Sequence, residues 1–200
     1  MPHAFDNVFL PVALNVRGRR CVVIGDDAEA RAKAAALRAA GADVEWLRNP
    51  SQVGEHTLAE AFLVISSPRD EELSARLSAA AERARFLLCC IDQPKWSTLA
   101  MPAFVASGPV RVAISTGGVS PTVAATFRRA LARALDARFA RFMTLLQESR
   151  RRIRAAVIDE RERRERLRES AAEFAIEVSV SYPAWFERAE GDEGPGRRTR

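Results

Sequence analysis

The chain has 200 residues, of which 48% are hydrophobic and 28% are charged. This is the composition of a folded protein, and it excludes disorder along the whole chain. Its apolar runs are all far shorter than the ~18 residues that a membrane-spanning helix needs. Basic residues outnumber acidic ones by 31 to 26, which gives a net charge of +5 and favours an anionic ligand or partner.

The cysteines indicate a reducing environment. Cys21, Cys89 and Cys90 show no metal-ligand spacing, and the two histidines lie far from one another in sequence. Three thiols cannot form a complete set of disulfides. Residues 8–16 lack both the basic start and the uninterrupted apolar core of a secretory signal. We therefore expect a cytoplasmic protein without a structural metal.

The N-terminal half opens with a strand, a helix and a second strand. Residues 21–25 (CVVIG) form an apolar, β-branched run that is typical of a buried strand in a parallel sheet. Residues 26–40 are rich in alanine and predict a helix that ends at Gly41. Residues 43–47 predict the second strand. This β-α-β order indicates an α/β fold with a Rossmann-like, doubly wound parallel sheet.

Two more buried strands follow, with an amphipathic helix between them. They are predicted at residues 61–66, 71–85 and 86–91 in the order strand, helix, strand. Asp92 stands directly after the last strand. Because ligands gather at the carboxyl ends of the strands in such sheets, we expect Gly25, Ser66 and Asp92 to share one edge.

The pattern changes after residue 100. Residues 110–115 (VRVAIS) alternate with period two, as in a strand that has one solvated face and needs a partner. A tight loop follows, and then Ser120 and Pro121 form the N-cap and first position of a helix. Apolar residues continue at helical spacing to Phe142. Residues 147–170 interleave arginines with acids and predict an exposed helix or a pair of helices.

The first turn of the sheet carries an unusual charge. A dinucleotide site places glycines after the first strand, so that the pyrophosphate can approach the helix N-terminus. Residues 25–30 read GDDAEA, which keeps the first glycine and the final small residue but puts Asp26 and Asp27 between them. Carboxylates satisfy a helix N-terminus by themselves and repel a pyrophosphate. Taken alone, this turn argues against a dinucleotide.

Several short motifs occur in a fixed order along the chain. They are LPV at residues 10–12, RGRR at 17–20, CIDQPK at 90–95, MPA at 101–103 and ISTGGVSP at 114–121. With the strand-turn-helix between them, they resemble the precorrin-2 dehydrogenase/sirohydrochlorin ferrochelatase family, the N-terminal module of siroheme synthase. The resemblance covers about residues 9–135 and continues loosely into the helical region.

The resemblance implies a domain plan and an assembly. It implies a Rossmann-like domain, a small α+β dimerisation domain and a helical C-terminal domain, joined in a homodimer. We assign these to residues 1–101, 102–135 and 136–190, with a flexible tail at 191–200. The expected ligand is a tetrapyrrole, and neither nucleic acid nor a membrane is an expected partner.

The resemblance also implies a reaction and a catalytic residue. The family oxidises precorrin-2 to sirohydrochlorin with NAD, and some members then insert ferrous iron as a second substrate. Asp92 aligns with the family's proposed general acid/base, a role that contributes ~10²–10⁴-fold to a rate. The alternative is that Asp92 only caps the turn before Pro94.

Two further sets of residues follow from the resemblance. The expected cofactor-binding residues are Gly25, Asp27, Ala28, Glu29, Ser66 and Ser67. The expected substrate-binding residues are Thr116, Gly117, Gly118 and Ser120, whose backbone N–H groups could hold a carboxylate of the tetrapyrrole. A plain strand-to-helix turn is the alternative for this second set.

The chain departs from the family on the cofactor side. Asp26 and Asp27 replace glycines, Cys89 replaces an asparagine, and Pro68-Arg69 replaces a threonine-aspartate pair. The segment between residues 47 and 61 is also short, so that one strand of the sheet could be missing.

Three functions stay open at this point. The first is an NAD-dependent precorrin-2 dehydrogenase, with or without ferrochelatase activity. The second is a tetrapyrrole chelatase or carrier that has lost NAD binding. The third is a protein that binds RNA or another protein through its basic helices. The third is the weakest, because acids neutralise the arginines of residues 147–170 and no aromatic residue stands among them for base stacking.

Overall fold

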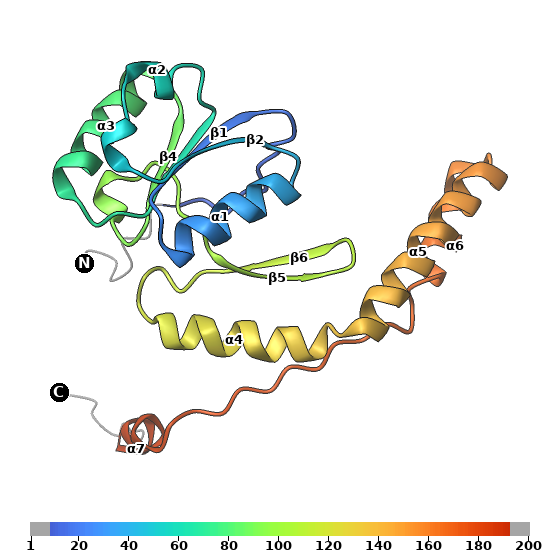
Figure 1. Ribbon diagram of the computed structural model, residues 1–200. Coiled ribbons are helices and arrows are strands. Elements are labelled where there is room, and N and C mark those ends of the chain that lie inside the picture. The colour runs from blue at the N-terminus through green and yellow to red at the C-terminus, as the bar shows by residue number, and fades with distance from the viewer. Residues whose placement is uncertain (1–8, 193–200) are drawn as a thin grey trace, which may run out of the picture. The chain divides into compact units, whose positions relative to one another are not determined.

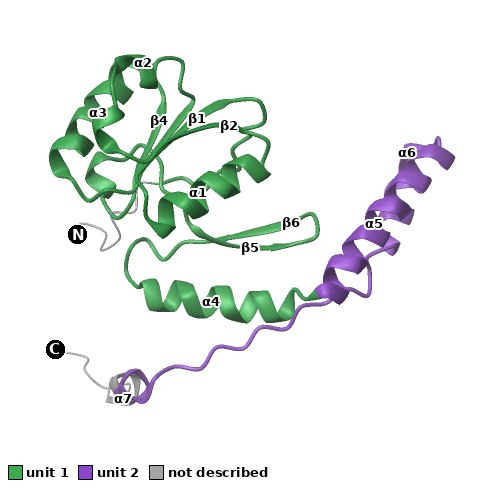
Figure 2. Cartoon of the chain, viewed as in Figure 1, with its two compact units in different colours: residues 1–136 green, residues 137–200 purple. Residues whose placement is uncertain are grey.

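The computed structural model describes residues 9–192 (Figure 1). The chain forms two compact units, Met1–Asp136 and Ala137–Arg200 (Figure 2). The predicted tail at residues 191–200 lies outside the described residues except for its first two, which close the last helix. None of the helices in the described part of the chain is long and apolar enough to cross a membrane.

A parallel sheet forms the centre of the first unit. Its strands are β1 (Arg20–Ile24), β2 (Asp43–Leu47), β3 (Leu63–Ser66) and β4 (Leu87–Cys90). They lie in the order β2-β1-β3-β4, and every neighbouring pair is parallel. The predicted Rossmann-like α/β fold is therefore confirmed. The segment between β2 and β3 folds into a short 3-10 helix, η1 (Pro50–Gln52), and a helical turn, α2 (Glu55–Leu58), without a strand.

Helices cover both faces of this sheet (Figure 1). Along each strand, alternate side chains enter different cores, which is why the strands read as continuous apolar runs. Val23 and Ile65 pack toward α1 (Ala28–Ala39). Ile24 and Val64 pack toward α3 (Glu71–Ala84) and α2. Full burial of each such side chain stabilises the fold by roughly 1.5–3 kcal/mol, so the sheet edge rests on a rigid base.

A hairpin and a helix complete the first unit. β5 (Ala103–Ser107) pairs antiparallel with β6 (Val110–Ile114), so β5 is the partner that the alternating residues 110–115 need. The sequence analysis did not predict β5. α4 (Pro121–Ala134) starts at the predicted Ser120 cap and packs against the hairpin. No residue of α4 is buried, and Phe104 and Phe127 are 52% and 45% exposed.

The second unit contains the remaining helices. They are α5 (Ala137–Ala156), α6 (Glu160–Glu169) and α7 (Ala184–Asp192). The predicted helical region at residues 147–170 is thus a pair of helices. The apolar spacing that runs to Phe142 is interrupted after α4. In α5, Phe142 stacks on Phe174 with ring centroids 5.2 Å apart.

Candidate active site

Three strands end level at one edge of the sheet. Ile24 pairs with Ser66, and Ser66 pairs with Cys90 on the far side. The ladder continues one residue further, because the Ser67 N–H donates to the Ile24 carbonyl at 3.0 Å and the Ile91 N–H to the Ser66 carbonyl at 2.8 Å. The loops after β1, β3 and β4 therefore meet at one edge. Ser66 itself is fully buried, so only its backbone takes part in that edge.

The turn after β1 requires glycine at residue 25. Gly25 has φ +117°, and a Cβ there would lie 2.2 Å from the Ser67 hydroxyl oxygen. Its carbonyl accepts a hydrogen bond from the Trp46 indole Nε1 at 2.8 Å. The Arg48 guanidinium lies over the Trp46 ring, 4.6 Å from its centroid, and 3.8 Å from the Asp26 carboxylate. The turn is therefore held from β2 and from β3.

Asp27 caps helix α1. Its Oδ1 accepts a hydrogen bond from the Ala30 N–H at 2.8 Å. That bond, with a smaller contribution from the Ser67 hydroxyl, holds the pKa of the Asp27 carboxyl below its usual value. Asp27 is therefore ionised at neutral pH. Its charge stands where the positive end of the helix would otherwise attract a phosphate.

The turn has the backbone of a dinucleotide site but not its charge. Gly25 supplies the left-handed conformation and the close approach that such a turn needs. The Asp27 carboxylate, however, takes up an N–H group at the helix N-terminus, and Asp26 adds a second negative charge beside it. A pyrophosphate does not fit this turn as it stands. The charges of Asp26 and Asp27 are also the reason why the sequence of residues 25–30 argues against a dinucleotide.

Asp92 lies in the loop after β4 and is in a left-handed conformation with φ 59°. Aspartate tolerates this conformation better than most residues do. The loop is held by Ser97, whose Oγ accepts from the Cys90 N–H at 2.9 Å, and by Gln93, whose Nε2 donates to the Pro68 carbonyl at 3.1 Å. The Asp92 carboxylate is 62% exposed and forms an ion pair with Arg69.

Asp92 does not cap the turn that follows it. The next element, η2 (Pro94–Trp96), has Gln93 as its N-cap and no side-chain cap bond. The alternative that the sequence left open for Asp92 is therefore wrong. Its carboxylate remains available to a ligand at the sheet edge.

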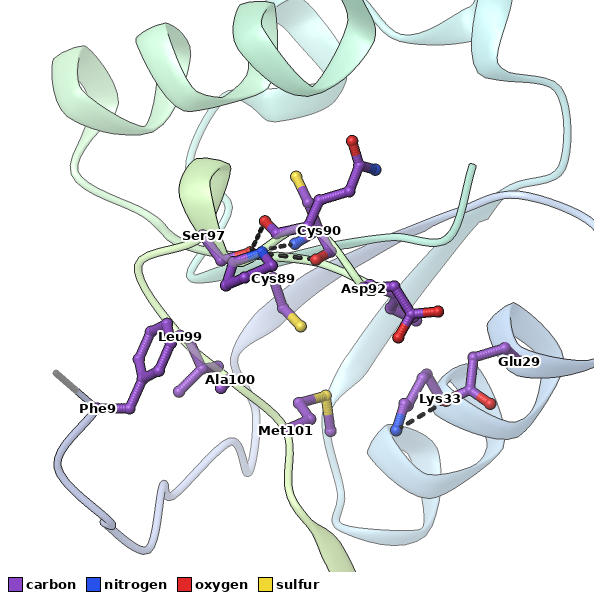
Figure 3. Close-up of a pocket in the computed structure, with 13 residues that line it drawn as sticks. Phe9, Glu29, Lys33, Cys89, Cys90, Asp92, Ser97, Leu99, Ala100 and Met101 are labelled. Atoms are coloured by element: carbon purple, nitrogen blue, oxygen red, sulfur yellow. Dashed lines mark hydrogen bonds and ion pairs between the residues drawn. The ribbon is translucent and has the colours of Figure 1, made fainter. Parts of the chain in front are cut away.

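A cleft of about 230 Å³ opens beside Asp92 (Figure 3). Figure 3 shows the Asp92 carboxylate pointing toward the Glu29–Lys33 pair of α1. The Lys33 ammonium lies 3.0 Å from the Glu29 carboxylate, and its side chain is only 20% exposed. Leu99 and Met101 line the apolar part of the cleft. The arrangement offers a ligand one carboxylate and one ammonium beside an apolar wall.

The two neighbouring thiols are buried. Cys89 and Cys90 also line the cleft, and both are free. Burial is the main cause that raises the pKa of each thiol above its usual value. Both thiols are therefore neutral at physiological pH. Within residues 9–192 no group of three or more potential metal ligands occurs either.

The glycine loop after β6 is not part of this cleft. Gly117 and Gly118 have positive φ values of 62° and 81°. The Thr116 hydroxyl donates to the Ser120 carbonyl at 3.2 Å, and the Ser120 Oγ accepts from the Val123 N–H at 3.2 Å. In the structure this loop bonds to itself and caps α4. Any role in substrate binding requires a ligand that extends beyond the cleft.

Sequence reasoning missed some residues that form the site. Lys33 and Met101 did not appear as candidates, and Arg69 was noted only as a departure from the family. The i,i+4 spacing of Glu29 and Lys33 could have revealed Lys33, because it puts both on one face of α1. Of the expected cofactor residues, only Glu29 lines the cleft, whereas Gly25, Asp27 and Ala28 form the neighbouring turn.

Comparison with known proteins identifies related sequences. A family described as "Putative NAD(P)-binding" matches residues 12–103. The siroheme synthase of Nitrosospira multiformis is 33% identical over 73% of this chain, and that of Methylococcus capsulatus is 31% identical over 84%. The matches span 36% and 40% of those two proteins, so the chain corresponds to well under half of their length.

A solved structure has the same fold. The structure titled "SirC, precorrin-2 dehydrogenase" superposes with a TM-score of 0.63 at 21% sequence identity. The superposition covers 80% of this chain and 88% of that one. The two chains therefore share an architecture that extends beyond the sheet.

Proposed function

Because the chain belongs to the precorrin-2 dehydrogenase family, we propose that it oxidises precorrin-2 to sirohydrochlorin in siroheme biosynthesis. The observation that carries the proposal is the Asp92 carboxylate, which is exposed at the cleft and is not used as a cap. The likeness to siroheme synthases supports the choice of a tetrapyrrole as the substrate.

In this proposal Asp92 acts as the general base. The oxidation removes a hydride and a proton from the macrocycle, and the carboxylate accepts the proton. Arg69 stands beside it and forms an exposed ion pair with the carboxylate. General base help of this kind contributes ~10²–10⁴-fold to the rate. In the family NAD accepts the hydride.

Lys33 can pair with one charge of the proposed substrate. A tetrapyrrole of this class carries many carboxylates, and Lys33 is the one cation among the residues that line the cleft in the described part of the chain. We propose that its ammonium binds one of these carboxylates in exchange for part of its contact with Glu29. The backbone N–H groups of residues 116–120 are the second proposed carboxylate site.

A second function is favoured by a specific observation. The Asp27 carboxylate stands where a pyrophosphate would bind, which weighs against a hydride acceptor in that place. The same Asp92 could then assist insertion of ferrous iron, since metal entry needs the pyrrole N–H groups to lose their protons. In the simplest form of this second function, the protein only carries the tetrapyrrole and catalyses no reaction.

An anaerobic absorbance assay separates the two functions. Purified protein is mixed with precorrin-2, with and without NAD, and then with sirohydrochlorin and ferrous iron. Sirohydrochlorin that forms only with NAD supports the dehydrogenase. Metal insertion without any dehydrogenation supports the chelatase. Asp92→Asn is the control, and a rate unchanged in this variant would overturn the role of Asp92 in either reaction.

We also propose a homodimer in the cytoplasm. Its proposed interface is the face of the hairpin and α4 that exposes Phe104, Val123 and Phe127. Apolar side chains that cluster on a surface are typical of such interfaces. Phe127→Glu should convert the dimer into a monomer in light scattering, whereas Leu145→Glu, at a somewhat more exposed site on α5, should not. The cytoplasmic location is supported by three free cysteines.

A further inference from the structure

We infer that Asp26 and Asp27 keep dinucleotide binding to this chain weak, because an internal carboxylate holds the place of the pyrophosphate at the N-terminus of α1. The inference concerns the cofactor side of the site alone. It does not depend on which tetrapyrrole reaction the Asp92 side performs.

One of the groups that would bind a phosphate at the start of α1 is already in use. A helix N-terminus binds a phosphate through its free N–H groups and its positive end. Here the Asp27 Oδ1 accepts from the Ala30 N–H at 2.8 Å, and the Ser67 hydroxyl lies beside the same carboxylate. A pyrophosphate would have to displace a charged, hydrogen-bonded side chain that is tethered to the helix.

The turn after β1 also carries two neighbouring negative charges. Asp26 stands next to Asp27, and its ion-pair partner Arg48 is 3.8 Å away. Arg48 also lies over the Trp46 ring, which keeps its guanidinium on the β2 side of the turn. An incoming pyrophosphate would therefore meet two carboxylates at short range, whereas a typical dinucleotide turn presents only backbone there.

The backbone of the turn keeps the conformation that a dinucleotide site needs. Gly25 keeps its positive φ and its close contact with Ser67. Only the two side chains at residues 26 and 27 stand in the way. Glycine is nearly as good an N-cap as aspartate in many helices, so exchanging both residues should leave α1 folded.

The test is direct titration with NAD and NADH, in the absence of any tetrapyrrole. Wild-type protein should bind with a dissociation constant in the millimolar range or weaker. The double variant Asp26→Gly/Asp27→Gly should bind at least about tenfold more tightly. Asp27→Asn keeps the cap but removes its charge, and it should fall between the two. Asp159→Gly removes the equivalent cap of α6, where Asp159 accepts from the Glu162 N–H at 2.8 Å, and should behave like wild type.

Two results would overturn the inference. One is micromolar binding by the wild-type protein. The other is a double variant that is folded by circular dichroism and binds no more tightly than wild type. Should the double variant be unfolded, Asp27→Asn decides by itself, since an affinity equal to wild type also overturns the inference. A failure of the tetrapyrrole assay would leave all these titrations unaffected, so the two proposals fail separately.

Discussion

Two aspartates at the same sheet edge have opposite surroundings. Asp27 follows β1, adopts an extended conformation with φ −85° and ψ 178°, and turns its carboxylate into the start of α1. Asp92 follows β4, adopts a left-handed conformation with φ 59°, and leaves its carboxylate 62% exposed beside a cleft. The residue type is the same, but the backbone decides whether the carboxylate stabilises a helix or is available for chemistry.

The site therefore has two halves, one around Asp27 and one around Asp92, and their surroundings differ in the same way. In the half around Asp27, the Trp46 indole donates to the Gly25 carbonyl and a helix N–H donates to the carboxylate. The half around Asp92 has an exposed ion pair on one side and the half-buried Lys33 on the other. Groups satisfied within the fold add stability, whereas groups that face a cleft can serve a ligand. The predictions below separate these two roles.

The largest expected effect follows substitution of Asp92. Asp92→Asn should lower kcat by ~10²–10⁴-fold, because the amide cannot accept the proton. Asparagine tolerates a left-handed conformation about as well as aspartate, so the fold should be unchanged. Steady-state rates of Asp92→Asn and Asp27→Asn, measured under the same conditions, provide the comparison. An equal loss in both variants would contradict the division of roles.

A smaller effect is expected at Lys33. Lys33→Met should raise KM on the order of tenfold with little change in kcat, because one charged hydrogen bond to the substrate is lost. Lys95→Met is the matched control, since Lys95 is exposed, pairs with Glu71 at 2.7 Å and does not line the cleft. A KM that stays at the wild-type value in Lys33→Met would exclude Lys33 from substrate binding.

Loss of the ion pair between Asp92 and Arg69 should reduce activity less than substitution of Lys33 does. Both partners are exposed, with Arg69 at 76%, and solvent screens such pairs strongly. Arg69→Gln should therefore reduce kcat/KM by less than about fivefold. The loss should shrink further as salt is added, because salt screens the wild-type pair as well. A loss comparable with that of Asp92→Asn would mean that Arg69 contacts the substrate itself.

The smallest effect concerns stability and pH. The folded state lowers the pKa of Asp27 below its usual value of 3.8, so its charge stabilises the fold above that pH. The free energy of unfolding should exceed that of Asp27→Asn at pH 7. This difference should disappear as the pH falls through the lowered pKa of the folded state. Urea unfolding at pH 7, 5 and 3 measures it, and a difference that grows toward pH 3 would have the wrong sign.

Much of the fold could be predicted because buried parallel strands have a strong sequence signal. Residues 43–47 were predicted with the observed bounds of β2, and Ser120 and Pro121 mark the start of α4 as expected. β5 was missed because AFVAS is short and carries small residues, so its pairing with β6 depends on the hairpin rather than on its own composition.

The site was less predictable than the fold. The meeting of the strand ends at Gly25, Ser66 and Asp92 follows from the parallel topology, and the sequence predicted it. The position of Lys33 beside Asp92 depends on how α1 packs on the sheet, which no local sequence pattern contains. The sequence alone left two interpretations of Asp92; in the structure its carboxylate is exposed and paired with Arg69, and it does not cap the following turn.

The bond between the Trp46 indole and the Gly25 carbonyl gives the molecule an optical probe. Indole emission depends on the hydrogen bond and on the charged Arg48 that covers the ring. The chain has three tryptophans, and Trp96 and Trp185 can be replaced by phenylalanine. The emission of the single remaining tryptophan would then report on the surroundings of the β1 turn in real time.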